Sequence, residues 1–234
     1  MNNEKINLTN DAYSLHRILK TDIKKDPNVE EDEIIFGCGC FWGAEKCFWK
    51  LPGVVTTSVG YAGGEKNNPT YYEVCSGLTG HSEVVRVIWD KREIDVSDLL
   101  KMFWECHDPT QKNRQGNDIG TQYRSAIYYK NENNIKTILA SKEQYQTELS
   151  KKNLGLIETE IKMIDSYFYA EQYHQQYLAS AGSRQYCSAS PTKVKLGVFT
   201  GSNYKLEDHI WENFNWEVDK CVLRSDNNPI KNNI

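Results

Sequence analysis

The stretch Gly-Cys-Gly-Cys-Phe-Trp-Gly at residues 37–43 decides how this chain folds, because a strand pattern meets a helix pattern there. The residues just before it, 33–36, are mostly β-branched or aromatic, which is typical of a strand. Residues 44–51 suit a helix, which Pro52 and Gly53 would end. The sequence therefore predicts a strand over 33–38 and a helix over 43–51, with Cys40 at the N-terminus of the helix.

A cysteine at a helix N-terminus has a setting that favours reactivity. Unpaired backbone N–H groups and the positive end of the helix dipole stabilise a thiolate, which is the nucleophilic form. Gly39 and Gly43 allow a sharp turn and the close approach of another molecule. We therefore expect Cys40 to be a nucleophile with a lowered pKa; the alternative is one more small buried residue. Strand alternation turns Cys38 toward the core, where it should be inert.

Length, charge and cysteine content limit the class of protein. A chain of 234 residues with 39% hydrophobic residues can bury one good core, so we expect a single domain. The net charge of −4 argues against binding to nucleic acid or to an anionic membrane. The polar N-terminus and the lack of any apolar run of 18 residues predict a soluble, cytoplasmic protein. Seven cysteines without regular spacing also fit a reducing compartment.

The remaining elements follow from hydrophobic periodicity. We expect further strands over 54–60, 83–89, 123–129 and 156–162, and further helices over 96–106, 132–150 and 170–180. This order mixes hairpin-like and crossover connections, which predicts an α+β fold. The expected architecture is a two-layer sandwich of a mixed β-sheet and packed helices, with a ferredoxin-like core.

Three segments of different composition suggest how the chain is organised. Residues 1–32 are polar and predict a loosely attached N-terminal extension. Residues 33–187 hold the dense pattern of strands and helices and would form the catalytic domain. Residues 188–234 lack clear periodicity, and we expect a long irregular C-terminal segment that wraps on that domain.

A carboxyl group is predicted to accompany the thiol. Two-residue alternation places Glu83 on the same strand face as Val85 and Val87, and a carboxyl on an apolar face has a raised pKa. It could then act as a general acid, unless it points to water at the first residue of its strand. A thiolate with such an acid suits the reduction of an S=O or peroxide oxygen. The resulting sulfenic acid can condense with a second thiol, for which Cys187 is in reach unless it is an unengaged tail thiol.

A set of motifs in order resembles the peptide methionine sulfoxide reductase A family. The matching stretches are residues 39–43, 60–64, 68–71, 80–83, 107–110 and 114–125, and residues 174–178 extend the match. The resemblance spans about residues 33–187 and leaves both ends of the chain outside it.

The resemblance implies a role for several residues around the thiol. Cys40 would attack the sulfoxide sulfur, and Glu83 would donate a proton to the sulfoxide oxygen. Tyr71 and Tyr123 match the two tyrosines that hold this oxygen, which agrees with the ability of phenol groups to donate hydrogen bonds. Asp118 matches the carboxylate that supports the site.

The resemblance also implies a substrate pocket and a resolving thiol. Phe41 and Trp42 match the apolar pocket for the S-methyl group of the substrate. Cys187 matches the first resolving cysteine. A further cysteine often follows within a few residues in this family, whereas here the next is Cys221, which either relays the disulfide or has no role. Cys106 stands where many members carry asparagine, and we assign it no function.

The implied activity is the reduction of methionine-S-sulfoxide, free or in proteins, as repair of oxidative damage. The resemblance further implies recycling by thioredoxin. We expect no cofactor, no metal and action as a monomer. Three alternatives stay open: a cysteine hydrolase or acyl transferase with His81 or His107 as base, a zinc module, and a pure binding module whose site the tail hides. The zinc module would use Cys38, Cys40, Cys75 and His81, although Cys-x-Cys is a poor chelating spacing.

Overall fold

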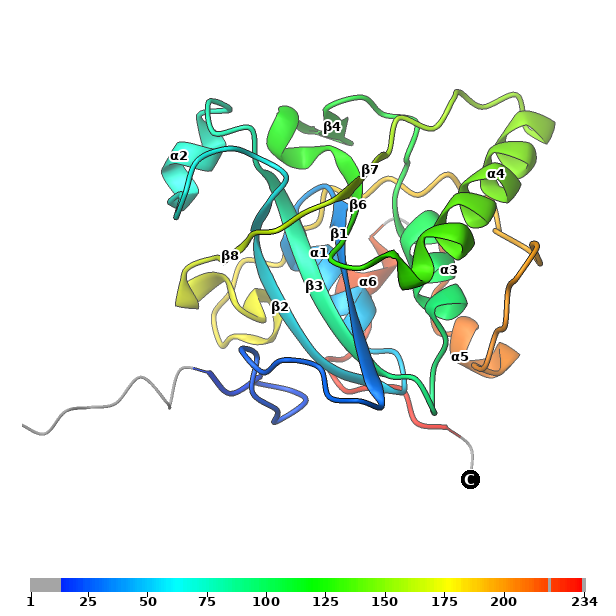
Figure 1. Cartoon of the computed structure of the whole chain (residues 1–234), viewed down its shortest axis with the longest axis horizontal. Coiled ribbons are helices and arrows are strands. Elements are labelled where there is room, and N and C mark those ends of the chain that lie inside the picture. Colours follow the sequence, from blue (N-terminus) through cyan, green and yellow to red (C-terminus); the bar gives the residue numbers. More distant parts are fainter. Residues whose placement is uncertain (1–13, 219, 233–234) are drawn as a thin grey trace, which may run out of the picture.

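A computed structural model describes residues 14–218 and 220–232 of the chain (Figure 1). Its centre is a six-stranded sheet in the order β7-β6-β1-β3-β2-β8. The strands are β1 (Glu31–Cys38), β2 (Val54–Ala62), β3 (Ser82–Asp90), β6 (Ser125–Tyr129), β7 (Glu160–Met163) and β8 (Tyr167–Tyr169). All neighbours pair antiparallel except β6 and β7, which are parallel. The sheet is therefore mixed, as predicted.

Helices cover one face of this sheet. The long ones are α1 (Phe41–Trp49), α3 (Val96–Cys106) and α4 (Ile135–Lys151). Alternate strand residues such as Phe36 and Val87 pack with these helices in the main core, while Ile35 and Val84 face a smaller cluster on the other side. This alternation is the two-residue period of a strand. The predicted α+β arrangement of a mixed sheet with packed helices is confirmed, and the ferredoxin-like core stays a prediction.

Shorter elements shape the loops around the sheet. They are α2 (Tyr71–Cys75), β4 (Arg114–Gln115), β5 (Asp118–Ile119), η2 (Thr121–Tyr123), η3 (Glu132–Asn134), η4 (Gln172–His174), η5 (Tyr177–Ala179), α5 (Asp208–Trp211) and α6 (Cys221–Arg224). The expected strand over 123–129 thus begins only at Ser125, because residues 121–123 form a 3₁₀ turn. The strand expected over 156–162 is shorter and later, at Glu160–Met163.

The helix predicted over 170–180 is wrong. Two 3₁₀ turns, η4 and η5, stand there instead, and Gln176 between them has a left-handed φ of 46°. The Gln175 side chain bonds to both backbone groups of Val59, and the Gln176 backbone N–H donates to the Glu45 carboxylate at 2.8 Å. These bonds to the body of the protein replace the bonds that a continuous helix would make.

Residues 14–30 differ from the loosely attached segment expected from their composition. His16 is fully buried, its Nε2 lies 2.9 Å from the Thr57 hydroxyl, and its Nδ1 accepts the backbone N–H groups of Ile18 and Leu19. Ile23 is also buried. A buried polar ring with all its bonds satisfied holds this segment against β2. The rest of the expected extension, residues 1–13, lies outside the described residues.

The segment after Cys187 runs over the helices with little regular structure (Figure 1). Leu196, Leu206 and Ile210 are buried in the main core. The Lys50 ammonium bonds to Asp226 and to the Asn228 carbonyl, which ties the end of the chain to the end of α1. These contacts attach the C-terminal segment to the helical layer.

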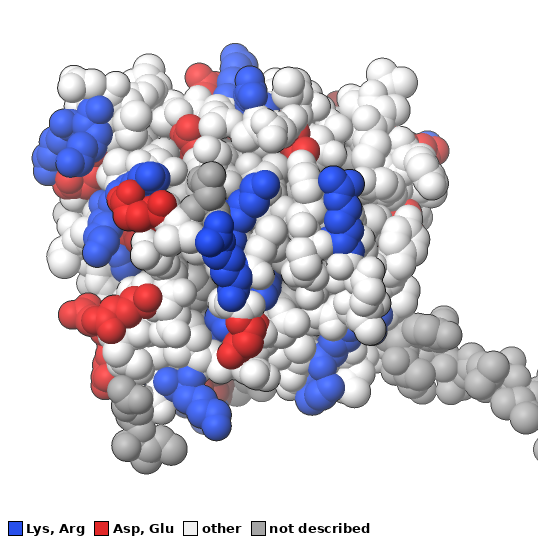
Figure 2. All heavy atoms as spheres, turned by 180° about the vertical axis from the view of Figure 1, so that it is seen from behind, with Lys and Arg blue, Asp and Glu red and all other residues white. Residues whose placement is uncertain are grey.

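Two surface properties bear on partners. Lysine and arginine side chains lie interspersed with acidic ones on the face seen in Figure 2. Within residues 14–218 and 220–232, no helix is long and apolar enough to cross a membrane.

Candidate active site

Cys40 lies at the junction where β1 ends and α1 begins, as the sequence predicted. It is the N-cap residue of α1, and its side chain is 8% exposed. Gly39 before it has a φ of +86°, a backbone conformation that favours glycine. The sulfur lines a cavity of about 320 Å³, which we call the acid cavity. Its walls are Cys40, Phe41, Trp42, Tyr71, Glu83, Asp118, Tyr123, Tyr177, Arg184 and Tyr186.

Every predicted site residue except Cys187 and Cys221 lines the acid cavity. These residues come from α1, α2, β3, β5 and η2, which are far apart in the sequence. The fold thus brings a thiol, two carboxyl groups and two phenols to one hollow. That is a set able to attack, protonate and bind a polar oxygen.

Glu83 is the buried carboxyl of this cavity. Its side chain is 2% exposed and accepts the Phe41 backbone N–H at 3.1 Å, so it does not point to water. Burial raises its pKa to about 8, and the negative charge of Asp118 adds to the rise. With that pKa, about nine-tenths of the Glu83 side chains carry a proton at pH 7. A proton donor therefore stands in the same cavity as the thiol.

The lowered pKa expected for Cys40 is wrong. Burial raises the pKa of this thiol well above its ordinary value, and a charged Glu83 would raise it further. A bond from the Trp42 backbone N–H favours the thiolate, as expected at a helix N-terminus, but desolvation outweighs it. Because Glu83 is mostly protonated at neutral pH, its repulsion is mostly absent there.

The two predicted tyrosines are held by short local elements. Tyr71 opens α2, whose start is fixed by a capping box between Thr70 and Glu73. Tyr123 ends η2. Burial raises the pKa of both phenols, so each keeps its O–H as a hydrogen-bond donor at physiological pH. The capping box was a visible sequence signal for α2, a helix absent from our sequence-based predictions.

Two aromatic cavity residues escaped the sequence analysis. The Tyr186 hydroxyl donates to Asp118 Oδ1 at 2.6 Å, so it fixes the carboxylate that lies near Glu83. Tyr177 stacks on the indole of Trp42, with ring centroids 3.9 Å apart. Tyr186 directly precedes Cys187, and this neighbour was the signal that could have identified it.

The apolar wall is built from aromatic rings. Phe41 packs against Tyr61 and His174 at centroid distances of 6.1 and 5.2 Å. The Trp42 indole N–H donates to Nδ1 of His174 at 3.1 Å, which fixes the orientation of the indole. Burial lowers the pKa of His174 to about 4, so this ring is neutral and can accept that bond.

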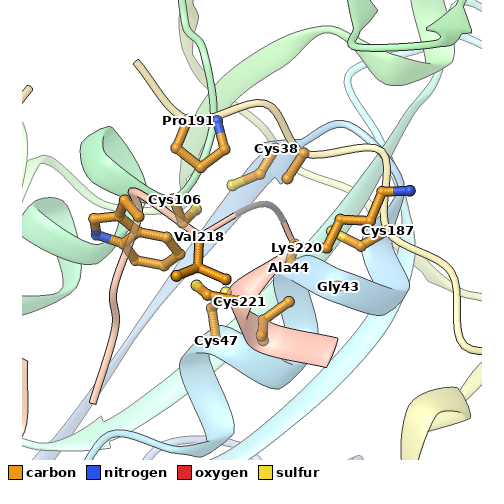
Figure 3. A pocket seen from close by; sticks show the side chains of 13 residues that line it. Cys38, Gly43, Ala44, Cys47, Cys106, Cys187, Pro191, Val218, Lys220 and Cys221 are labelled. Atoms are coloured by element: carbon orange, nitrogen blue, oxygen red, sulfur yellow. The ribbon is translucent and has the colours of Figure 1, made fainter. Parts of the chain in front are cut away.

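Cys187 and Cys221 line a different, smaller cavity of about 20 Å³, which we call the thiol cavity (Figure 3). Its walls are Cys38, Gly43, Ala44, Cys47, Cys106, Cys187, Ala189, Pro191, Trp216, Val218, Lys220, Cys221 and Val222. A Cβ atom on Gly43 would lie 2.5 Å from the Cys187 sulfur, so glycine is needed for this close packing. Helix α1 contributes residues to both cavities, and Cys187 packs on it one turn from Cys40.

The histidines considered as alternative bases are engaged elsewhere. His81 accepts the Gly64 N–H and bonds to the Lys66 carbonyl, and His107 bonds to the Phe103 carbonyl and the Ser125 hydroxyl. Neither lines the acid cavity. This removes the general base on which a cysteine hydrolase would depend.

The zinc set considered from the sequence is not brought together. Among the described residues, the group of possible ligands that converges is Cys38, Cys106 and His107, with ligand atoms within 4.8 Å of one another. Both ring nitrogens of His107 already have hydrogen-bond partners. Cys40, Cys75 and His81 are absent from this group.

Comparison with known proteins agrees with this geometry. Residues 32–204 match the family model for peptide methionine sulfoxide reductase. The chain is 53% identical over 180 residues to the peptide methionine sulfoxide reductase MsrA of Vibrio vulnificus, covering 77% of this chain and 86% of that protein. It is 57% identical over 164 residues to that of Azotobacter vinelandii, covering 70% and 76%.

Solved structures are also similar to this chain. Methionine sulfoxide reductase A of Corynebacterium diphtheriae aligns with a TM-score of 0.66 at 42% identity, over 78% of this chain and 88% of that chain. Mxr1 from Saccharomyces cerevisiae in reduced form aligns with a TM-score of 0.64 at 34% identity, over 70% and 92%. The chain belongs to the peptide methionine sulfoxide reductase family and is an oxidoreductase.

Proposed function

We propose that this chain reduces methionine-S-sulfoxide, free or within proteins, to methionine, with Cys40 as the nucleophile. The observation that carries this proposal is the shared cavity of the Cys40 thiol and a carboxyl, Glu83, that is still protonated at neutral pH. A sulfoxide needs both groups, because its sulfur must be attacked while its oxygen is protonated.

The first step transfers oxygen to the enzyme. The Cys40 sulfur attacks the sulfoxide sulfur while Glu83 protonates the sulfoxide oxygen. The S–O bond of the sulfoxide then breaks and the hydroxyl passes to the Cys40 sulfur, while the bond between the two sulfurs breaks and methionine leaves. Cys40 is oxidised by two electrons to a sulfenic acid and the substrate sulfur is reduced by two. The thiol proton of Cys40 replaces the proton that Glu83 gave.

The other cavity residues orient the substrate. Tyr71 and Tyr123 donate hydrogen bonds to the sulfoxide oxygen, where negative charge develops before proton transfer is complete. Burial keeps Glu83 protonated by raising its pKa, and the negative charge of Asp118, which Tyr186 holds in place, adds to this effect. Phe41 and Trp42 receive the S-methyl group, and aromatic walls of fixed orientation aim the sulfur at Cys40.

The second step resolves the sulfenic acid. The Cys187 thiol attacks the Cys40 sulfur, the hydroxyl leaves as water, and a Cys40–Cys187 disulfide forms. The packing of Cys187 on Gly43, three residues after Cys40, supports this assignment. Thioredoxin then reduces the enzyme. We propose that the protein acts this way as a monomer in the cytoplasm, without cofactor or metal.

Turnover of separated sulfoxide epimers tests this function. The purified chain is given the S or the R epimer of a dabsylated methionine sulfoxide with dithiothreitol, and the dabsylmethionine formed is measured by chromatography. We expect rapid reduction of the S epimer and none of the R epimer, and faster cycling when thioredoxin and its reductase replace dithiothreitol. Absence of methionine from both epimers would overturn the proposal.

A further inference from the structure

The enclosed position of Cys187 raises the question of how its disulfide is reduced. Cys187 is 2% exposed and Cys40 is 8% exposed, so a disulfide between them is hidden from a protein reductant. Five of the seven cysteines line the thiol cavity: Cys38, Cys47, Cys106, Cys187 and Cys221. The first four are buried, whereas Cys221 is half-buried. The thiol cavity thus connects the buried Cys187 with a thiol nearer to the surface.

Cys47 lies on the wall between these two thiols. It follows Gly43 by four residues on α1, so both stand on the same helix face. Cys187 rests on Gly43, and the side chain of a helical residue leans toward the helix N-terminus, which here is toward Cys187. Cys221 begins α6, which packs against α1, and Figure 3 shows the Cys47 and Cys221 side chains on the same side of the cavity.

The electrostatic couplings agree with this placement. After burial, the Cys47 thiol is the strongest influence that raises the pKa of Cys187. The same holds for Cys221, on which Cys47 acts more strongly than Cys187 does. Coulomb interactions fall with distance, so these couplings place Cys47 near both thiols.

We propose that Cys47 relays the disulfide from Cys187 to Cys221, an inference that rests on the proposed reductase function. The Cys47 thiolate attacks the Cys187 sulfur, a Cys47–Cys187 bond forms, and Cys40 leaves as a thiolate that takes up a proton. The Cys221 thiolate then attacks the Cys47 sulfur and releases Cys187. A dithiol protein such as thioredoxin finally attacks Cys221 and supplies the two electrons. Neither exchange is a net oxidation, because one disulfide replaces another.

One other thiol of the cavity, that of Cys38, serves as a control. The Cys106 thiol donates to the Phe103 carbonyl at 3.5 Å and lies within 4.8 Å of the Cys38 sulfur. The Cys106 thiol also bonds to the thiols of Cys38 and Cys47, so a change at Cys106 would disturb Cys47. Cys38 shares the burial and the cavity of Cys47 but bonds to Cys106 instead. Replacing Cys38 by alanine should leave the relay intact.

Mass spectrometry can observe the relay directly in the natural chain. Trypsin places Cys40, Cys47, Cys187 and Cys221 on different peptides: 26–46, 47–50, 185–193 and 221–224. The reduced protein receives one equivalent of methionine sulfoxide without reductant, is quenched in acid with N-ethylmaleimide at successive times, and is digested. We expect the 26–46/185–193 pair first, then 47–50/185–193, and finally 47–50/221–224.

The order of these species decides between the relay and a direct exchange. If peptide 185–193 joins 221–224 directly and peptide 47–50 never forms a disulfide, the relay through Cys47 is wrong although the reductase function stands. The relay is equally wrong if the disulfide stays between Cys40 and Cys187. If no methionine forms, the proposed function itself fails, and methionine is measured in the same samples.

Kinetics of a matched pair of variants give a second readout. Cys47→Ala should leave single-turnover methionine formation unchanged but slow thioredoxin-dependent cycling by about tenfold, since thiol exchange then lacks its intermediate nucleophile. Cys38→Ala should cycle like the natural protein. Equal cycling of the Cys47→Ala and Cys38→Ala variants would overturn the relay.

Discussion

The acid cavity and the thiol cavity share helix α1 as a wall, yet they offer their cysteines opposite surroundings. The acid cavity, of about 320 Å³, presents Cys40 with two carboxyl groups and several phenols. The thiol cavity, of about 20 Å³, surrounds Cys187 with four other cysteines and mostly apolar side chains. The acid cavity is large enough for a substrate and holds groups that can protonate its oxygen. The thiol cavity is too small for a substrate, and its sulfurs can react only with one another.

The difference shows why a high thiol pKa need not prevent catalysis. Burial raises the pKa of both Cys40 and Cys187. Beside Cys40, however, the proposed substrate brings a basic oxygen and Glu83 supplies the matching acid, so proton movement and sulfur attack can occur together. Among the residues that the structure describes, none with a carboxyl side chain lines the cavity of Cys187. Its proposed reaction is with an oxidised sulfur, which needs a thiol but no acid of that strength.

Removing the thiol of the acid cavity should have the largest effect and tests the different roles of the two cavities most severely. Cys40→Ser should reduce sulfoxide turnover below detection, because a hydroxyl neither attacks the sulfoxide sulfur nor accepts its oxygen. The assay is chromatographic detection of dabsylmethionine. Cys38→Ala, two residues away in the core, should stay active. If Cys38→Ala lost activity and Cys40→Ser kept it, the nucleophile would be Cys38, which lines the thiol cavity, and the assignment of Cys40 would be wrong.

Removing the thiol of the second cavity should have a different kind of effect. Cys187→Ser should form one equivalent of methionine per enzyme and then stop with thioredoxin, because the sulfenic acid on Cys40 has no resolving partner. A burst experiment measures the stoichiometry. Cys38→Ser, at another buried cysteine of the thiol cavity, is the matched control and should cycle normally. Normal cycling of Cys187→Ser would remove its resolving role.

Removing the acid of the acid cavity, Glu83, should slow the reaction without abolishing it. Glu83→Gln keeps the shape but loses the proton, so single-turnover reduction should slow by about 10² to 10⁴-fold, the usual contribution of general acid catalysis. Glu158→Gln, at an exposed position, should have no effect. An unchanged rate in Glu83→Gln would remove the general-acid assignment.

The titration of Glu83 should also make the single-turnover rate depend on pH. The pKa of Glu83 is raised to about 8, so the side chain holds its proton below that pH and loses it above. The single-turnover rate should therefore lose its acid-catalysed part as the pH rises through about 8. Glu83→Gln should lack this descending limb, and a natural protein whose rate only rises up to pH 10 would contradict the assignment.

A smaller effect should follow from loosening α1, the shared wall. Buried Glu45 accepts bonds from the Thr57 hydroxyl and from both the backbone and the side chain of Gln176. Glu45→Gln replaces one accepting oxygen with an NH₂ group that would face the donors of Thr57 and Gln176. This change should lower the free energy of unfolding by about 1–3 kcal/mol. Urea denaturation measures this, with exposed Glu143→Gln as control.

The pH dependence of stability sharpens that prediction. Burial raises the pKa of Glu45 to about 7 from 4.5, so the folded protein binds this proton more tightly than the unfolded chain. The contribution of Glu45 to stability is thus full below pH 4.5 and is lost as the pH rises to about 7. Glu45→Gln should remove this part of the pH dependence. Identical pH profiles for both proteins would contradict it.

The smallest expected effect concerns the support of Asp118. Tyr186→Phe removes the bond to Asp118, and a lost hydrogen bond of about 1 kcal/mol corresponds to roughly a fivefold slower single turnover. The exposed Tyr173→Phe should change nothing. A loss as large as that of Glu83→Gln would show that Tyr186 itself contacts the substrate.

Sequence alone predicted those parts of the structure that local periodicity encodes. Alternating residues in β1 and β3 and the apolar stripe of α3 located the sheet, its helical layer and the burial of Glu83. The helix expected over 170–180 failed because Gln175 and Gln176 bond to β2 and Glu45, partners more than a hundred residues away. No local pattern reports such contacts.

The sequence predicted which residues form the site but not their pKa values. Family motifs named most residues of the acid cavity, yet the pKa of Cys40 rises because burial outweighs the helix N-terminus. The balance of these two effects depends on tertiary packing. The thiol cavity had no sequence signal, because its five cysteines come from β1, α1, α3, α6 and the segment after η5.

The most direct test of Cys40 as the nucleophile locates the oxygen after one turnover. Reduced Cys187→Ser protein receives one equivalent of methionine-S-sulfoxide with dimedone, which labels sulfenic acids, and its tryptic peptides are sequenced by mass spectrometry. We expect one equivalent of methionine and one dimedone adduct on Cys40 in peptide 26–46. Methionine formed with the adduct on any other cysteine, or with no oxidised cysteine at all, would contradict the proposed mechanism.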